Sequence, residues 1–169
     1  MSPPTLGRPS YSKPLPPREI FAEYPTGIRM VLLLHYDDNR PEADYMNDVV
    51  PYHSESSRIE QTIVDRNLQG AQLEKEGRLD DAIRLYEANI ADCVDTPHPY
   101  HRLRVIYSKR KQFEAAIRVC EAYVSASKQL RDAILVEYGD KNLATQLGNP
   151  LRFPEWIEKL QAKRGNPRS

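Results

Sequence analysis

The stretch GRLDDAIRLYEANI, residues 77–90, decides the fold, because a closely similar phrase returns as KQFEAAIRVCEAYV at residues 111–124. Ala82 aligns with Ala116, and every other matched pair has the same offset in the sequence. An isoleucine, an arginine and a glutamate also recur at matching places. A fixed period of this size is typical of proteins built from repeated structural units.

Length and composition allow one domain with tails. The chain has 169 residues, and six of its 14 prolines fall between Pro3 and Pro17. Because proline fixes φ and lacks an N–H donor, we expect residues 1–26 to be extended or disordered. The PLPP segment at residues 14–17 is interpreted as linker, which is commoner than a polyproline II ligand.

Cysteine usage and hydropathy favour a cytoplasmic protein. The sequence has two cysteines, no signal peptide and no apolar run near the length of about 20 residues that a membrane span needs. Its longest apolar stretch, IRMVLLL at residues 28–34, is short and includes Arg29. We therefore expect no membrane partner.

The same apolar stretch predicts the only β-strand. Its branched residues are followed by the turn-forming DDNRP. A lone strand leaves its backbone groups unpaired, so two alternatives stay open. It folds back against helices of this chain, with the acidic residues 37–48 facing the basic second half, or it adds to the edge of a partner's sheet.

Helix signals become strong at Ser57, where SRIE has the pattern of a capping box. Apolar residues at near-helical spacing follow as far as Gly77: Ile59, Ile63, Leu68 and Leu73. We predict further helices over residues 79–92 and 99–109, and a last one from 154 to about 163. Between them, residues 113 to about 138 form either one long helix or two helices with a slight kink near residues 125–127.

These residues resemble the tetratricopeptide repeat (TPR) family, whose unit is a pair of antiparallel helices with a period of about 34 residues. In the first unit the family's small or apolar positions hold Gly70, Leu73, Gly77, Leu79, Ala82, Ile83, Tyr86 and Ile90. In the second they hold Tyr100, Leu103, Tyr107, Phe113, Ala116, Ile117, Cys120 and Val124. Arg104 and Lys111 depart from two small positions, and one further step from Ala116 reaches Pro150. Two repeats are predicted.

The predicted architecture is all-α: antiparallel helix-hairpin repeats forming a TPR-like α-solenoid fragment. Residues 1–56 form an extended, proline-rich arm that contains the strand. Residues 57–139 hold the repeats, with units at about 63–96 and 97–130. Residues 140–169 supply a loop, a capping C-terminal helix and a tail, because a short array needs caps.

The sequence contains no recognisable catalytic set. GxGxxG, GxxxxGK[ST], HExxH and paired CxxC motifs are all missing. His98 and His101 lie one turn apart beside Cys93, but a structural zinc site needs four ligands. Cys120 falls in the apolar seam and is interpreted as a small core residue. We therefore expect a protein that is not an enzyme and holds no metal or cofactor.

The resemblance implies where a partner binds. In the TPR family the first helix of each unit lines a concave groove that holds a peptide or a partner's helix. The matching positions are Asn67, Ala71, Glu74, Lys75, His101, Arg102, Val105, Ser108 and Lys109. This set is polar and mildly basic, and it lacks the paired asparagines and lysines that clamp a C-terminal carboxylate in some members. It implies a protein-binding adaptor, as a subunit or accessory factor of a larger assembly.

An uneven charge distribution supports one alternative function. Residues 1–96 carry a net charge of −7 and residues 97–169 a net charge of +7. Such a split favours an intramolecular clasp or a basic face offered to an acidic partner. The alternative is a nucleic-acid-associated accessory protein using KRK at 109–111 with Arg102 and Arg104. Nucleic-acid binding asks for more charge and interleaved aromatics, so the adaptor is preferred, with its oligomeric state open.

Overall fold

The computed structural model describes residues 15–36 and 45–166, and the predictions for residues 1–14 and for the acidic segment 37–44 lie outside these ranges. Within them the chain is all-α, as predicted, with no strand. The elements are α1 (Thr26–Leu34), the short π-helix η2 (Tyr45–Val49), α2 (Val50–Lys75), α3 (Leu79–Ala91), α4 (His98–Lys109), α5 (Phe113–Tyr138), α6 (Lys141–Leu147) and α7 (Phe153–Gly165).

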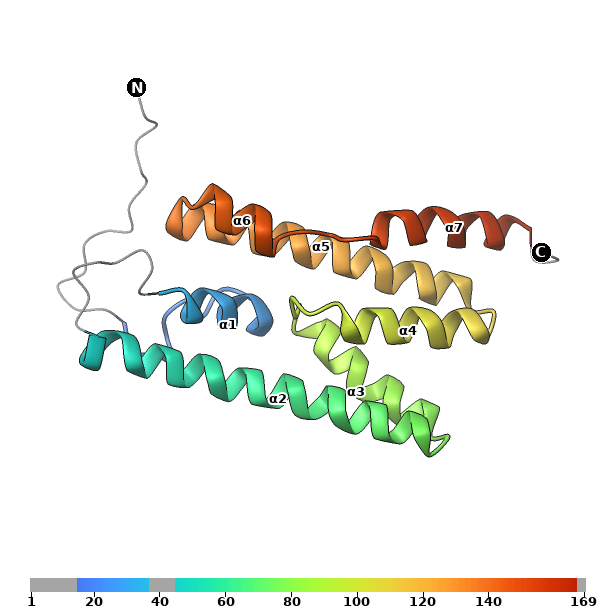
Figure 1. Ribbon diagram of the computed structural model, residues 1–169, viewed down its shortest axis with the longest axis horizontal. Helices are drawn as coiled ribbons and strands as arrows, with labels where there is room; N and C mark the ends of the chain where they lie inside the picture. The colour runs from blue at the N-terminus through green and yellow to red at the C-terminus, as the bar shows by residue number, and fades with distance from the viewer. Residues whose placement is uncertain (1–14, 37–44, 167–169) are drawn as a thin grey trace, which may run out of the picture.

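Most helices pack against their neighbours in the chain. α2 contacts α3, α3 contacts α4, and α4 contacts α5, while α6 and α7 both lie along α5 (Figure 1). The helices α2 and α5 have 26 residues each and extend well beyond the shorter α3 and α4. α1 fills the space between these extensions and contacts both of them.

The predicted strand at residues 28–34 is wrong, because these residues form most of α1. Ile28, Val31 and Leu32 are all buried, at the i, i+3, i+4 spacing of one helix face. Branched residues favour strands in isolation. A helix, however, pairs its backbone groups internally, and no strand is available beside it in the described chain.

α1 folds back against the helices of its own chain, which is the intramolecular alternative. The backbone N–H of Gly27 donates to the carbonyl of Asp92 at 2.7 Å, and the Tyr138 hydroxyl donates to the carbonyl of Leu32. A Cβ added at Gly27 would lie 2.7 Å from the backbone of residues 92–94, so only glycine permits this approach. α1 is therefore part of the core.

The described part of the N-terminal arm is also packed, contrary to the expectation of an extended or disordered tail. Ile20 and Phe21 are each 3% exposed. The Arg29 Nε donates to the carbonyl of Ile20 at 3.0 Å, and the Tyr52 hydroxyl donates to that of Leu15 at 2.5 Å. Buried apolar side chains and hydrogen bonds from Arg29 and Tyr52 thus hold this segment on α1 and α2.

Helix boundaries depart from the prediction at two places. α2 begins at Val50, so Ser57 lies inside the helix rather than at its N-cap. Pro51 stands in the first turn of α2, a position where proline is tolerated, and η2 leads directly into this turn. α6 occupies part of the predicted loop, and the Asp140 side chain caps it by accepting a bond from Leu143 N at 2.9 Å.

Candidate partner-binding surface

Two turns with the same backbone join α2 to α3 and α4 to α5. Gly77 and Lys111 both take left-handed values, with φ of 76° and 57°. The next residues, Arg78 and Gln112, have φ of −89° and −88°. Each donates its N–H to a carbonyl of the preceding helix, at 2.9 and 2.8 Å. The first hairpin (α2 with α3) and the second hairpin (α4 with α5) therefore close in the same way.

Packing inside the two hairpins differs at one pair of matched positions. In the first hairpin, a Cβ added at Gly70 would lie 2.6 Å from the Tyr86 ring, so the tyrosine requires glycine there. The second hairpin has Arg104 and Cys120 at the equivalent places, one period later. Cys120 is fully buried, and burial lowers the pKa of Arg104. The first hairpin thus has a small residue on its first helix and a large one on its second, and the second hairpin has the reverse arrangement.

Glu74 and Arg102, both predicted at the binding face, are brought together. Arg102 donates to the Glu74 carboxylate from Nε at 3.0 Å and from Nη2 at 2.5 Å. The Tyr86 hydroxyl donates to the same carboxylate at 2.7 Å. The bond from Arg102 is the main cause that lowers the pKa of Glu74, and burial raises the pKa of Tyr86. This cluster joins α2, α3 and α4.

Asn67 is engaged with α3 rather than presented as a free amide. Its Oδ1 accepts a bond from Asn89 Nδ2 at 3.0 Å. Asn89 is fully buried, and it also donates to the carbonyl of Ile63 at 3.1 Å and accepts from Arg66 Nη1 at 3.2 Å. Every polar atom of this buried side chain is satisfied, as burial requires. Asn67 therefore contributes to the interior of the first hairpin.

The remaining predicted residues on α2 and α4 are more open. Ser108 donates to the carbonyl one turn earlier at 2.6 Å. Ala71 and Val105, at equivalent positions of the two units, are both half-buried, and Lys75 and Lys109, at the ends of the two helices, are exposed. Neither lysine makes an ion pair with any described residue. The two lysines, with Ala71 and Val105, form the centre of the candidate surface.

Two apolar residues extend this surface along α2. Val64 is 39% exposed and Leu68 is 66% exposed. The spacing of Leu68 placed it with the apolar residues Ile59, Ile63 and Leu73, but unlike them it is not buried. Val64, Leu68, Ala71 and Lys75 follow at intervals of four, three and four, and so share one helix face. We call these four residues, with Val105 and Lys109, the α2–α4 surface.

His101 has a neighbour that the sequence pattern does not reveal. The ring of Trp156 on α7 lies 5.3 Å from the His101 ring, and the Arg104 guanidinium carbon lies 3.9 Å from the Trp156 centroid. Phe153 packs on the same tryptophan at 4.8 Å. The aromatic pair in FPEW indicates a packed helix, but nothing in the sequence indicates that it meets α4. α7 thus borders the predicted face.

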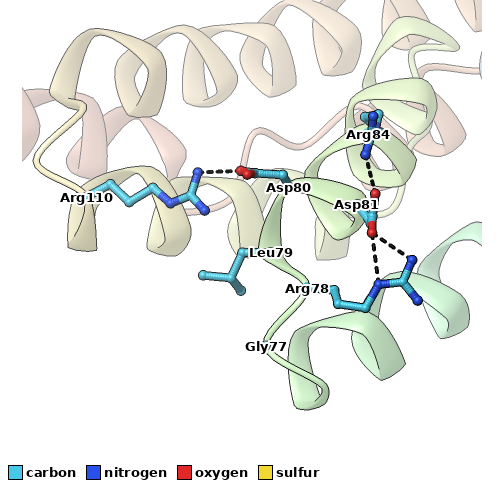
Figure 2. Close-up of a pocket in the computed structure, with 7 residues that line it drawn as sticks. All are labelled: Gly77, Arg78, Leu79, Asp80, Asp81, Arg84 and Arg110. Atoms are coloured by element: carbon cyan, nitrogen blue, oxygen red, sulfur yellow. Dashed lines mark hydrogen bonds and ion pairs between the residues drawn. The ribbon is translucent and has the colours of Figure 1, made fainter.

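A surface pocket lies at the turn between α2 and α3 (Figure 2), and none of its lining residues belongs to the α2–α4 surface. It is lined by Gly77, Arg78, Leu79, Asp80, Asp81, Arg84 and Arg110. Arg78 and Arg84 both pair with Asp81, and Arg110 pairs with Asp80 at 2.8 Å. Because each arginine is bonded to an aspartate, the lining leaves no cationic group free to hold an anion.

The cysteines and histidines form no metal site in the part of the chain that the structure describes, where no cluster of three or more His, Cys, Asp or Glu side chains occurs. Burial raises the pKa of the Cys120 thiol to about 12, and burial also raises that of Cys93. Both thiols are therefore protonated at neutral pH and weakly nucleophilic. None of the described helices combines the length and the hydropathy that crossing a membrane requires.

Comparison with known proteins found no matching family model, no similar curated protein and no similar solved structure.

Proposed function

We propose that the chain is a non-catalytic, TPR-like repeat module that binds a protein or peptide partner on the α2–α4 surface, as a subunit or accessory factor of a larger assembly. The observation that carries this proposal is the agreement between the sequence period and the backbone of the two hairpin turns. Ala82 and Ala116, at equivalent positions, both have no exposed surface. Small buried residues at these positions let the two helices of each hairpin approach closely.

The chemistry of the surface favours a partner segment with apolar and acidic side chains. Val64, Leu68 and Ala71 offer an apolar stripe at the spacing that an amphipathic helix or a peptide can cover. Lys75 and Lys109 end their helices at the same end of the molecule (Figure 1) and lack ion pairs with described residues. Unpaired cations of this kind attract carboxylates and set the orientation of a partner.

Ion pairs within the chain weigh against the alternative of nucleic-acid binding. Among the described residues, basic residues of the second half are bonded to acidic residues of the first half in three pairs: Arg102 with Glu74, Arg110 with Asp80, and Arg118 with Glu87. Arg110 is the centre of the KRK cluster. Part of the basic excess is therefore already neutralised, whereas nucleic-acid affinity depends on cations that meet phosphates.

The proposal is tested by comparing two charge-reversed variants in partner recovery from native cells. Lys75→Glu with Lys109→Glu alters the α2–α4 surface. Lys128→Glu with Lys141→Glu makes the same charge change on α5 and α6, where both lysines are also exposed. We expect the native chain and the second variant to recover the same protein, and the first variant to lose it while melting at a similar temperature.

Equal recovery by both variants would show that the surface is misplaced. Recovery that disappears after nuclease treatment, with affinity falling steeply as salt rises, would support the nucleic-acid alternative instead.

A further inference from the structure

The junction between α4 and α7 holds the only tryptophan of the chain. Trp156 packs against two side chains of α4, the His101 ring and the Arg104 guanidinium. The Arg104 Nη2 lies 3.1 Å from the His101 Nδ1. A neutral side chain, a titratable one and a permanently charged one are therefore in mutual contact.

Elementary chemistry determines the protonation state of His101 in this arrangement. A guanidinium has only donors and stays charged at any physiological pH. The contact is thus a hydrogen bond only when His101 Nδ1 carries a lone pair, which requires a neutral ring with its proton on Nε2. The Arg104 Nε is buried and makes no hydrogen bond with the described residues, so losing the histidine leaves this arginine still less satisfied.

We propose that His101 is a proton-sensitive contact: protonation at Nδ1 breaks its bond to Arg104, sets two cations side by side, and loosens the packing of Trp156 at the α4–α7 junction. The contact belongs to the second hairpin alone. Gly70 occupies the position of Arg104 in the first hairpin and can make no such bond. Arg104, which stands where the first hairpin has a glycine, therefore has a specific role in the second hairpin.

The charges around His101 favour the neutral ring at pH 7. The titratable and charged groups around the cluster are Arg102, Arg104 and His98 on α4, Arg152 at the N-cap of α7 with its ion-pair partner Glu155, Glu74 on α2, and Cys120 and Glu121 on α5. Glu74 is committed to Arg102. Burial, followed by Arg104, Arg102 and His98, lowers the pKa of His101. The folded chain therefore takes up this proton at a lower pH than an ordinary histidine, whose pKa is about 6.5.

The sign of the stability change follows from the same shift. Because the pKa of His101 is lower in the folded chain, the unfolded chain takes up its proton first as the pH falls. Stability is then lost between about pH 6.5 and the lowered pKa of the folded state. His101 also borders Arg102 at the predicted binding face. A pH-dependent affinity for the partner is a consequence that rests on the proposed function.

Trp156 itself supplies the measurement, because its emission reports the junction directly. The full native chain, His101→Gln and His98→Gln are titrated from pH 8 to pH 5 by tryptophan fluorescence, with far-UV circular dichroism as the check of folding. We expect the native chain and His98→Gln to change emission with a midpoint below about 6.5. His101→Gln keeps an acceptor for Arg104 but cannot be protonated, and its emission should stay constant over this range.

An unchanged transition in His101→Gln, or a constant emission in the native chain, would overturn the inference. So would an NMR spectrum at pH 8 in which the His101 proton resides on Nδ1. The titration uses the chain without a partner, so its outcome is independent of the α2–α4 surface. Failure of the lysine variants to lose a partner would leave it untouched.

Discussion

Lys111 holds a backbone conformation that its own side chain disfavours. Its φ of 57° is left-handed, and the equivalent residue of the first hairpin is Gly77, with a φ of 76°. For a residue with a Cβ, this conformation costs about 1–2 kcal/mol of conformational free energy, whereas glycine adopts it freely. The second hairpin therefore keeps the turn of the first at a local cost.

This comparison predicts opposite effects for two reciprocal substitutions. Lys111→Gly should raise the free energy of unfolding by up to about 1 kcal/mol, because relief of strain exceeds the added chain entropy. Gly77→Ala should lower it by about 1 kcal/mol. The measurement is urea denaturation, with Gly165→Ala as a control at a glycine that has open space around its Cβ position and no positive φ. Equal signs for the two substitutions would contradict the shared turn.

At the scale of the elements, Ala82 on α3 and Ala116 on α5 are fully buried at equivalent positions, and we expect their small side chains to let the helices of each hairpin approach closely. Replacing either by leucine adds three carbon atoms to a packed interface. We expect each of Ala82→Leu and Ala116→Leu to cost about 1–3 kcal/mol. Ala162→Leu, on the exposed face of α7, is the matched control and should leave the melting temperature unchanged. If both Ala82→Leu and Ala116→Leu leave the melting temperature unchanged, the helices of each hairpin do not pack closely at these alanines.

Helices α3, α4, α5 and α7 can be predicted because their apolar periodicity is unbroken and their ends carry Gly, Pro or charged residues. α1 cannot, because its branched residues give the same signal in a strand and in a buried helix. The start of α2 is equally hidden, because a capping-box pattern also occurs inside helices. Local pattern thus identifies elements only where it is unambiguous.

The candidate site is predictable in its members but not in its contacts. Glu74 and Arg102 both belong to the predicted binding face, yet their bond depends on how the second hairpin packs on the first. The approach of Trp156 to His101 depends on α7 returning along α5. Side chains that meet across different helices have no signature in a single sequence.

At the scale of the whole molecule, α1 closes the space between the long helices α2 and α5 (Figure 1). Leu32 and Leu33 are fully buried there. We therefore expect the amides of residues 30–33 to exchange with solvent as slowly as those in the middle of α5 when the chain is alone. Hydrogen exchange followed by mass spectrometry tests this, and full exchange within seconds would restore the alternative of an arm ordered only by a partner.

The central claim is that a partner binds on the α2–α4 surface, and site-specific photocrosslinking in native cells tests it most directly. A crosslinking amino acid at Leu68, which is 66% exposed, is compared with the same amino acid at Val136, which is 70% exposed near the end of α5. The account predicts a discrete crosslinked protein from position 68 and none from position 136. No adduct at position 68, or the same adducts from both positions, would contradict it.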